Sequence, residues 1–80
     1  MEHLRRYELM PYFQYKGQVI TAFLYFKGNS DLVHSWDIIM GPHNLSKMMP
    51  DDLRALGFNE FDLDIINDRV ASYVNHKEGR

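Results

Sequence analysis

The chain has 80 residues, a length that fits one domain, since domains typically run to roughly 100–200 residues. Nine basic and eleven acidic residues give a formal net charge of −2, which excludes a generally basic nucleic-acid binder. The absence of cysteine excludes disulfides and cysteine-ligated zinc. Eleven aromatic residues and many β-branched ones supply enough apolar surface to order the chain, so we expect a single small folded domain over residues 1–80.

Three segments in the first half of the chain alternate between two faces and are rich in aromatic and β-branched residues. This pattern predicts strands over residues 5–15, 18–27 and 32–40. Pro11 cannot donate a backbone hydrogen bond, which predicts an edge position or a bend for the first strand. The middle strand is apolar on both faces, which predicts a central position in the sheet.

The second half of the chain has the features of two helices. Pro50 suits the first turn of a short helix over residues 50–56, and Gly57 suits its C-terminal cap. Asn59 is a good N-cap for a longer helix over residues 60–75. One apolar stripe of that helix contains Leu63, Ile66, Val70, Tyr73 and Val74. We therefore predict an α+β fold, a three-stranded antiparallel β-meander with both helices on one face.

Acidic residues are concentrated in the predicted helices. Residues 51–68 hold six acids and one base, a net charge of −5, so the rest of the chain carries +3. Glu60, Asp64 and Asp68 recur at a spacing of four and should form a column, although like charges at that spacing weaken a helix. A solvated helix face is the simpler interpretation. The functional one is a docking surface for a basic partner protein, formed by Asp51, Asp52, Glu60, Asp64 and Asp68.

Aromatic side chains crowd the predicted strands. One layer of helices covers one sheet face, so the other face should expose Tyr12 or Tyr25. Exposed aromatic residues at this density are typical of a protein interface, and the alternative is that they all serve a small core. We therefore add Tyr12 and Tyr25 to the expected partner-binding residues. We also expect a homo-oligomer or a complex, because so short a chain buries a modest core.

The sequence lacks catalytic and metal-binding motifs. No serine has a Gly-x-Ser-x-Gly context, and the isolated glycines form no phosphate-binding loop. His34 and Asp37 lie three residues apart on a predicted strand and so point to opposite faces. His34 and His43 could approach only through the turn after residue 40, and a third metal ligand is missing. We expect a protein that is not an enzyme and has no cofactor.

Three functions follow, in order of preference. The first is a non-catalytic module that docks on a partner protein and modulates it. Its size and acidity resemble phage or mobile-element inhibitors of the anti-defence or anti-CRISPR type, and immunity or antitoxin proteins. The second is a small nucleic-acid-binding regulator that uses the sheet aromatics, although the strand bases are few (Arg5, Arg6, Lys16 and Lys27). The third is a small metal or hydrolytic protein that uses His34 and His43.

No segment of the sequence resembles a targeting signal or a membrane span. The N-terminal residues are charged at once, and the longest apolar run, residues 19–26, is far shorter than the roughly 20 residues that cross a bilayer. We therefore expect a cytoplasmic location and no membrane partner.

Overall fold

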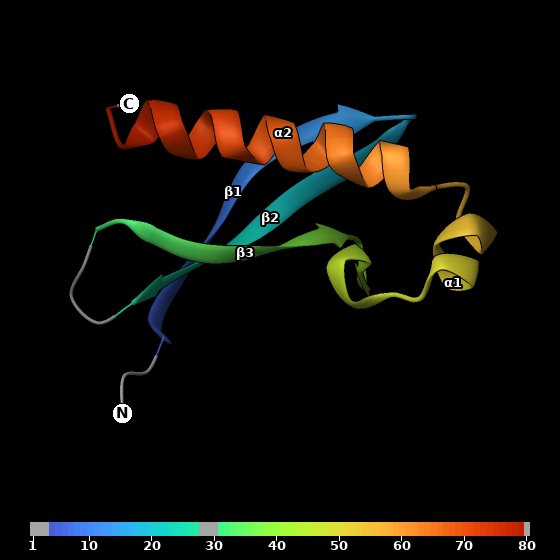
Figure 1. Cartoon of the computed structure of the whole chain (residues 1–80), viewed down its shortest axis with the longest axis horizontal. Helices are drawn as coiled ribbons and strands as arrows, with labels where there is room; N and C mark the ends of the chain where they lie inside the picture. Colours follow the sequence, from blue (N-terminus) through green and yellow to red (C-terminus); the bar gives the residue numbers. More distant parts are fainter. Residues whose placement is uncertain (1–3, 28–30, 80) are drawn as a thin grey trace.

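Four strands and two helices make up the computed structural model, which describes residues 4–27 and 31–79, and the side chains of residues 9–26 and 31–79. One antiparallel sheet has the order β1 (Leu4–Tyr15), β2 (Gln18–Lys27), β3 (Val33–Met40) and β4 (His43–Asn44). The 3-10 turn η1 (Leu45–Lys47), α1 (Pro50–Ala55) and α2 (Glu60–Lys77) follow (Figure 1). The α+β class predicted from the sequence is confirmed.

The fourth strand corrects the predicted count of three. The sequence predicts only that the third strand ends at residue 40 and is followed by a turn. Gly41 adopts a φ of +57° in a two-residue turn, a conformation that glycine takes without steric cost. The chain then reverses, and His43 pairs with Met40. Asn44 ends β4, and its side chain accepts a hydrogen bond from the Ser46 backbone N–H at 3.1 Å, which caps η1.

The first strand lies at the sheet edge, as Pro11 indicates. Its pairing with β2 is irregular between Leu9 and Tyr12, the segment that contains Pro11. The two strands are joined by a turn in which Lys16 and Gly17 both have positive φ, the conformation that suits a two-residue hairpin. β2 lies between β1 and β3, which confirms the central position predicted from its two apolar faces.

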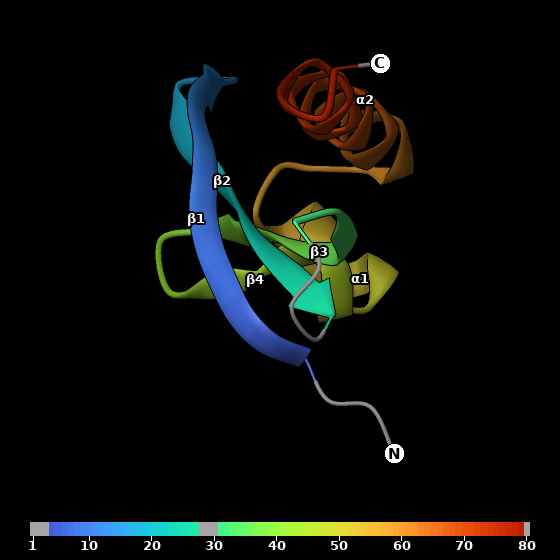
Figure 2. The same cartoon turned by 90° about the vertical axis from the view of Figure 1, so that its left-hand side faces the viewer.

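The helices cover one face of the sheet. Side chains from β2 and α2 interlock there, and the fully buried ones include Leu24, Phe26, Ile66 and Val70. The predicted α2 stripe is confirmed, with Leu63 and Tyr73 packed at the margin of the core. Trp36 on β3 donates its indole N–H to the Asn67 side chain at 2.9 Å. Figure 2 shows both helices on the same side of the curved sheet.

The long helix extends past its predicted end. α2 continues to Lys77 rather than residue 75, and α1 ends at Ala55 rather than residue 56. Glu78 follows α2, and its carboxylate accepts a hydrogen bond from the Val33 backbone N–H at 2.6 Å. This bond attaches the C-terminal end of α2 to the start of β3. Glu78, which lies beyond the predicted end of this helix at residue 75, therefore helps to fix the helix on the sheet.

Candidate protein-binding surface

The start of α2 is held by a reciprocal capping box. The Asn59 side chain accepts a hydrogen bond from the Asp62 backbone N–H at 3.0 Å. The Asp62 carboxylate accepts one from the Asn59 backbone N–H, also at 3.0 Å. Two backbone donors that a helix leaves unpaired at its first turn are satisfied in this way. The sequence predicts Asn59 as the cap, and the structure adds Asp62 as its counterpart.

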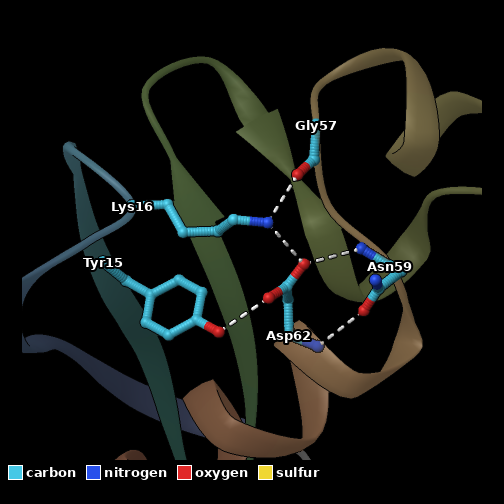
Figure 3. A network of polar contacts seen from close by, with 5 residues as sticks. All are labelled: Tyr15, Lys16, Gly57, Asn59 and Asp62. Atoms are coloured by element: carbon cyan, nitrogen blue, oxygen red, sulfur yellow. Dashed lines mark hydrogen bonds and ion pairs between the residues drawn. The ribbon is translucent and has the colours of Figure 1, made fainter.

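Asp62 also joins the helix to the β1–β2 hairpin (Figure 3). The Tyr15 hydroxyl donates to one carboxylate oxygen at 2.6 Å, and the Lys16 ammonium group lies 3.1 Å from the other. Lys16 donates as well to the Gly57 carbonyl at 3.0 Å. Asp62 is only 7% exposed, so it is the member of the acidic group that faces inward. This network fixes where α2 begins relative to the sheet.

The network shifts the pKa values of two of its members. The pKa of Asp62 lies below its ordinary value, mainly because the Tyr15 hydroxyl donates to the carboxylate, with further help from Asn59 and Lys16 and some opposition from burial. The pKa of Tyr15 is raised, first by the same hydrogen bond and then by desolvation. The folded protein therefore favours an ionised Asp62 beside a neutral Tyr15.

We expect the stability of the protein to fall in acid through Asp62. A carboxyl group whose pKa is lower in the folded than in the unfolded chain stabilises the fold when the pH is above its unfolded-state pKa, about 3.9. This contribution is lost as the pH falls through the folded-state pKa. Asp62→Asn should lower the melting temperature at neutral pH and flatten its dependence on pH below about 4. Asp64→Asn, at an exposed acid on the same helix, should keep the wild-type profile. Parallel acid profiles for the wild type and Asp62→Asn would contradict this role.

The other acids of residues 51–68 face outward. Asp51 pairs with Arg54 on the surface of α1. Within the described part of the chain, no ion pair involves Asp52, Glu60, Asp64 or Asp68, and all four are exposed. Glu60, Asp64 and Asp68 follow one another along the exposed side of α2, as the spacing predicts. Their uncompensated charges form a negative surface on the side of the helix that faces solvent.

Two apolar side chains lie among these acids. Phe61 is 70% exposed and Ile65 is 48% exposed, and both are on α2 outside the buried stripe. Asp64 and Asp68 are three and seven residues after Phe61, positions that share its side of a helix. We call Glu60, Phe61, Asp64, Ile65 and Asp68 the acidic-apolar face. Phe61 and Ile65 are not among the site residues predicted from the sequence. Their spacing of four, on a different side of the helix from the core stripe, could have indicated an exposed apolar pair.

A groove continues this face toward β1. It is a shallow, open groove of about 570 Å³ between α2 and the first strand. The Arg69 guanidinium group lies 5.1 Å from the centre of the Phe13 ring and forms part of the wall. The remaining lining residues are Pro11, Ile65, Asp68, Ser72 and Tyr73. Apolar walls with one acid and one base at the rim can receive a side chain that has an apolar stem and a charged end.

The two predicted aromatic site residues lie on the opposite face of the sheet. Tyr12 is 59% exposed, as expected for a side chain on the uncovered face. Tyr25 is half-buried, and its hydroxyl donates to the Asp37 carboxylate at 2.9 Å. The structure therefore does not bring Tyr12 and Tyr25 together with the acids of α2. The predicted partner-binding residues fall on two separate surfaces.

The histidines do not form a shared site. His34 lies near the start of β3, and His43 pairs with Met40 at its other end. Six residues of strand separate these positions, roughly 20 Å at about 3.3 Å per residue. Over residues 4–27 and 31–79, no group of three metal-ligating side chains is found. His34 is exposed, because a register shift at the start of β3 turns Val33 rather than His34 toward the core.

Comparison with protein-family models, with curated proteins and with solved structures finds no match for this chain. None of the helices in the described residues is long and apolar enough to span a membrane.

Proposed function

We propose that the protein is a non-catalytic binding module that docks on a partner protein through the acidic-apolar face of α2 and modulates that partner. The observation that carries the proposal is the exposure of Phe61 and Ile65 among three carboxylates that have no ion-pair partner within the described part of the chain. A partner suited to this face has an apolar pocket with lysine or arginine at its rim. Phage or mobile-element inhibitors of the anti-defence or anti-CRISPR type, and immunity or antitoxin proteins, are the classes we propose within this function.

Charge and shape favour this face over the remainder of the surface. Exposed apolar side chains at the centre of an interface supply most of the binding energy, while surrounding charges steer the encounter and select the partner. Three acids in a column destabilise an isolated helix by a few tenths of a kcal/mol for each pair. A basic partner surface would offset that repulsion, because each acid would then face a positive charge. We therefore propose Glu60, Asp64 and Asp68 as recognition residues, with Asp51 and Asp52 on the adjoining helix.

Nucleic-acid binding through the sheet has less support. Of the four bases on or beside the strands, Lys16 is held by Asp62 and Gly57 on the helix side, away from the uncovered face. The side chains of Arg5, Arg6 and Lys27 lie outside those that the structure describes. We expect weak and salt-sensitive association with oligonucleotides at most.

Affinity capture tests the proposed function. We expect the immobilised chain to retain one protein in stoichiometric amount from nuclease-treated lysate of the source cells, and high salt to release it. The purified protein should then bind in titration calorimetry, with an affinity that falls as ionic strength rises. Tight binding of a short oligonucleotide at physiological salt, or binding of the recovered protein that is indifferent to salt, would overturn the proposal.

A further inference from the structure

The groove between α2 and β1 lies on a side of the helix that the core leaves free. Ile65, Asp68 and Ser72 recur at spacings of three and four along α2, so they share that side of the helix. Pro11 and Phe13 of β1 form the opposite wall. Ile65 and Asp68 also belong to the acidic-apolar face. A partner that docks on that face therefore reaches the groove as well.

Asp68 brings a negative charge to the groove, and no ion pair within the described residues compensates it. The base that lines the groove is engaged within the chain. The Arg69 guanidinium group lies 5.1 Å from the centre of the Phe13 ring and donates a hydrogen bond to the Gln14 carbonyl at 3.4 Å. These two contacts hold Arg69 against the β1 wall. Asp64 lies about one helical turn before Asp68 and adds a second exposed carboxylate on that side, so the open part of the groove favours a cation.

The shape of the groove favours a side chain carried by a partner over a free small molecule. Sites for small molecules are clefts or cavities that bury most of the surface of their ligand. This groove has a volume of about 570 Å³ but is shallow and open. Something else must therefore exclude water from a charged group bound in it. A side chain of a partner protein meets this need, because the surface that carries it also closes the groove.

Among cationic side chains, arginine matches these walls best. Its planar guanidinium group forms two parallel hydrogen bonds with a carboxylate such as that of Asp68, and it stacks on aromatic rings. Tyr73 contributes an aromatic ring to the lining, and the Phe13 ring already accommodates the guanidinium group of Arg69. The apolar stem of an arginine can pack against Ile65 while its charged end stays at the rim. Lysine has a similar stem but lacks the planar group.

We propose that the groove between α2 and β1 receives an arginine side chain of the partner protein, with its stem against Ile65 and its guanidinium group on the Asp68 carboxylate. This inference rests on the function proposed above and adds the chemistry of the anchor. The partner surface then presents an arginine beside the apolar area that covers Phe61. Arginine is one of the residue types that most often dominate the binding energy of an interface.

Titration of the isotope-labelled full chain with acetyl-arginine-methylamide, followed by NMR at constant ionic strength, tests the groove directly. The backbone amide signals of residues 65–73 should shift and saturate at millimolar concentrations. Acetyl-citrulline-methylamide, in which a neutral urea group replaces the guanidinium group, should bind at least about fivefold more weakly. Asp68→Asn should weaken binding of the arginine compound by a similar factor. Asp64→Asn is the matched variant, since it makes the same change on the same helix outside the lining, and it should keep the dissociation constant within about twofold.

Equal binding of the arginine and citrulline compounds would overturn the inference, and so would an Asp68→Asn variant that binds as tightly as the wild type. Tighter binding of acetyl-lysine-methylamide would also contradict the choice of arginine.

Partner binding separates this inference from the proposed function. A captured partner whose affinity falls with Phe61→Ala and Asp64→Asn but not with Asp68→Asn would support the function and overturn the arginine anchor. Saturable binding of the arginine compound to a chain that captures no partner would support the groove as an arginine site and overturn the proposed function.

Discussion

Reversing the three charges along α2 is expected to lower the affinity for the protein partner by more than tenfold, about 1.4 kcal/mol. The variant is Glu60→Lys/Asp64→Lys/Asp68→Lys, and all three side chains are exposed. Attraction to a basic surface becomes repulsion, and the rate of association should fall most at low salt. The core stripe of α2 is untouched, so the melting temperature should stay the same or rise slightly.

Two triple variants distinguish the effect of charge on the acidic-apolar face from the effect of the net charge of the protein. Glu60→Gln/Asp64→Asn/Asp68→Asn makes the net charge more positive by three. Gln18→Lys/His34→Lys/His76→Lys makes nearly the same change at exposed positions away from the acidic-apolar face. The first should weaken partner binding and its salt dependence, and the second should leave both largely intact. Unchanged affinity and salt dependence in the well-folded reversal variant would show that the acids form only a solvated helix face.

Truncation of two neighbouring isoleucines on α2 is expected to have different effects, one on stability and the other on partner binding. Ile66 is fully buried against the sheet, so Ile66→Ala removes core contacts and leaves a cavity. The substitution should lower the free energy of unfolding by about 2–5 kcal/mol. That is a large share of the about 5–15 kcal/mol that stabilises a typical small protein. The melting temperature should fall by more than about 10 °C. Chemical denaturation followed by circular dichroism gives the change in the free energy of unfolding.

Ile65→Ala is the control for stability and the test for binding. Ile65 is 48% exposed and lines the groove beside Asp68, so its truncation should change the free energy of unfolding by less than about 1 kcal/mol. Partner affinity should nevertheless fall, because the partner would bury this side chain. If Ile65→Ala binds as the wild type does while Phe61→Ala also has no effect, the apolar part of the face is not used.

The fold was predictable where one local pattern decided the outcome. β2 is apolar on both faces, and a central strand is the arrangement that buries both in part. Asn59 and Pro50 mark helix starts through backbone hydrogen bonding within a single turn. β4 was not predicted, because its two residues are too few to show the alternation of faces that marks a strand. It forms because Gly41 permits a reversal that places His43 opposite Met40.

The site was predictable only in part, because spacing does not distinguish an exposed acid from a buried one. Asp62 and Asp64 are similar in the pattern of acids, yet Asp62 is buried against Tyr15 and Lys16, which precede it by more than 40 residues. That contact depends on how the hairpin and the helix pack. The same packing leaves Phe61 and Ile65 outside the core, since the stripe of Ile66, Val70 and Val74 already fills the space over β2.

Site-specific photo-cross-linking tests the role of the acidic-apolar face most directly. A benzoylphenylalanine at position 61 keeps the aromatic ring of Phe61 and adds a photoreactive benzoyl group, which the 70% exposure of this side chain leaves room for, and the same probe at position 18 is the control. In lysate of the source cells, position 61 should cross-link one protein at peptides that contain or adjoin lysine and arginine, and position 18 should not. Cross-links to that partner from position 18 alone, or equally from both positions, would show that the partner does not select the acidic-apolar face of α2.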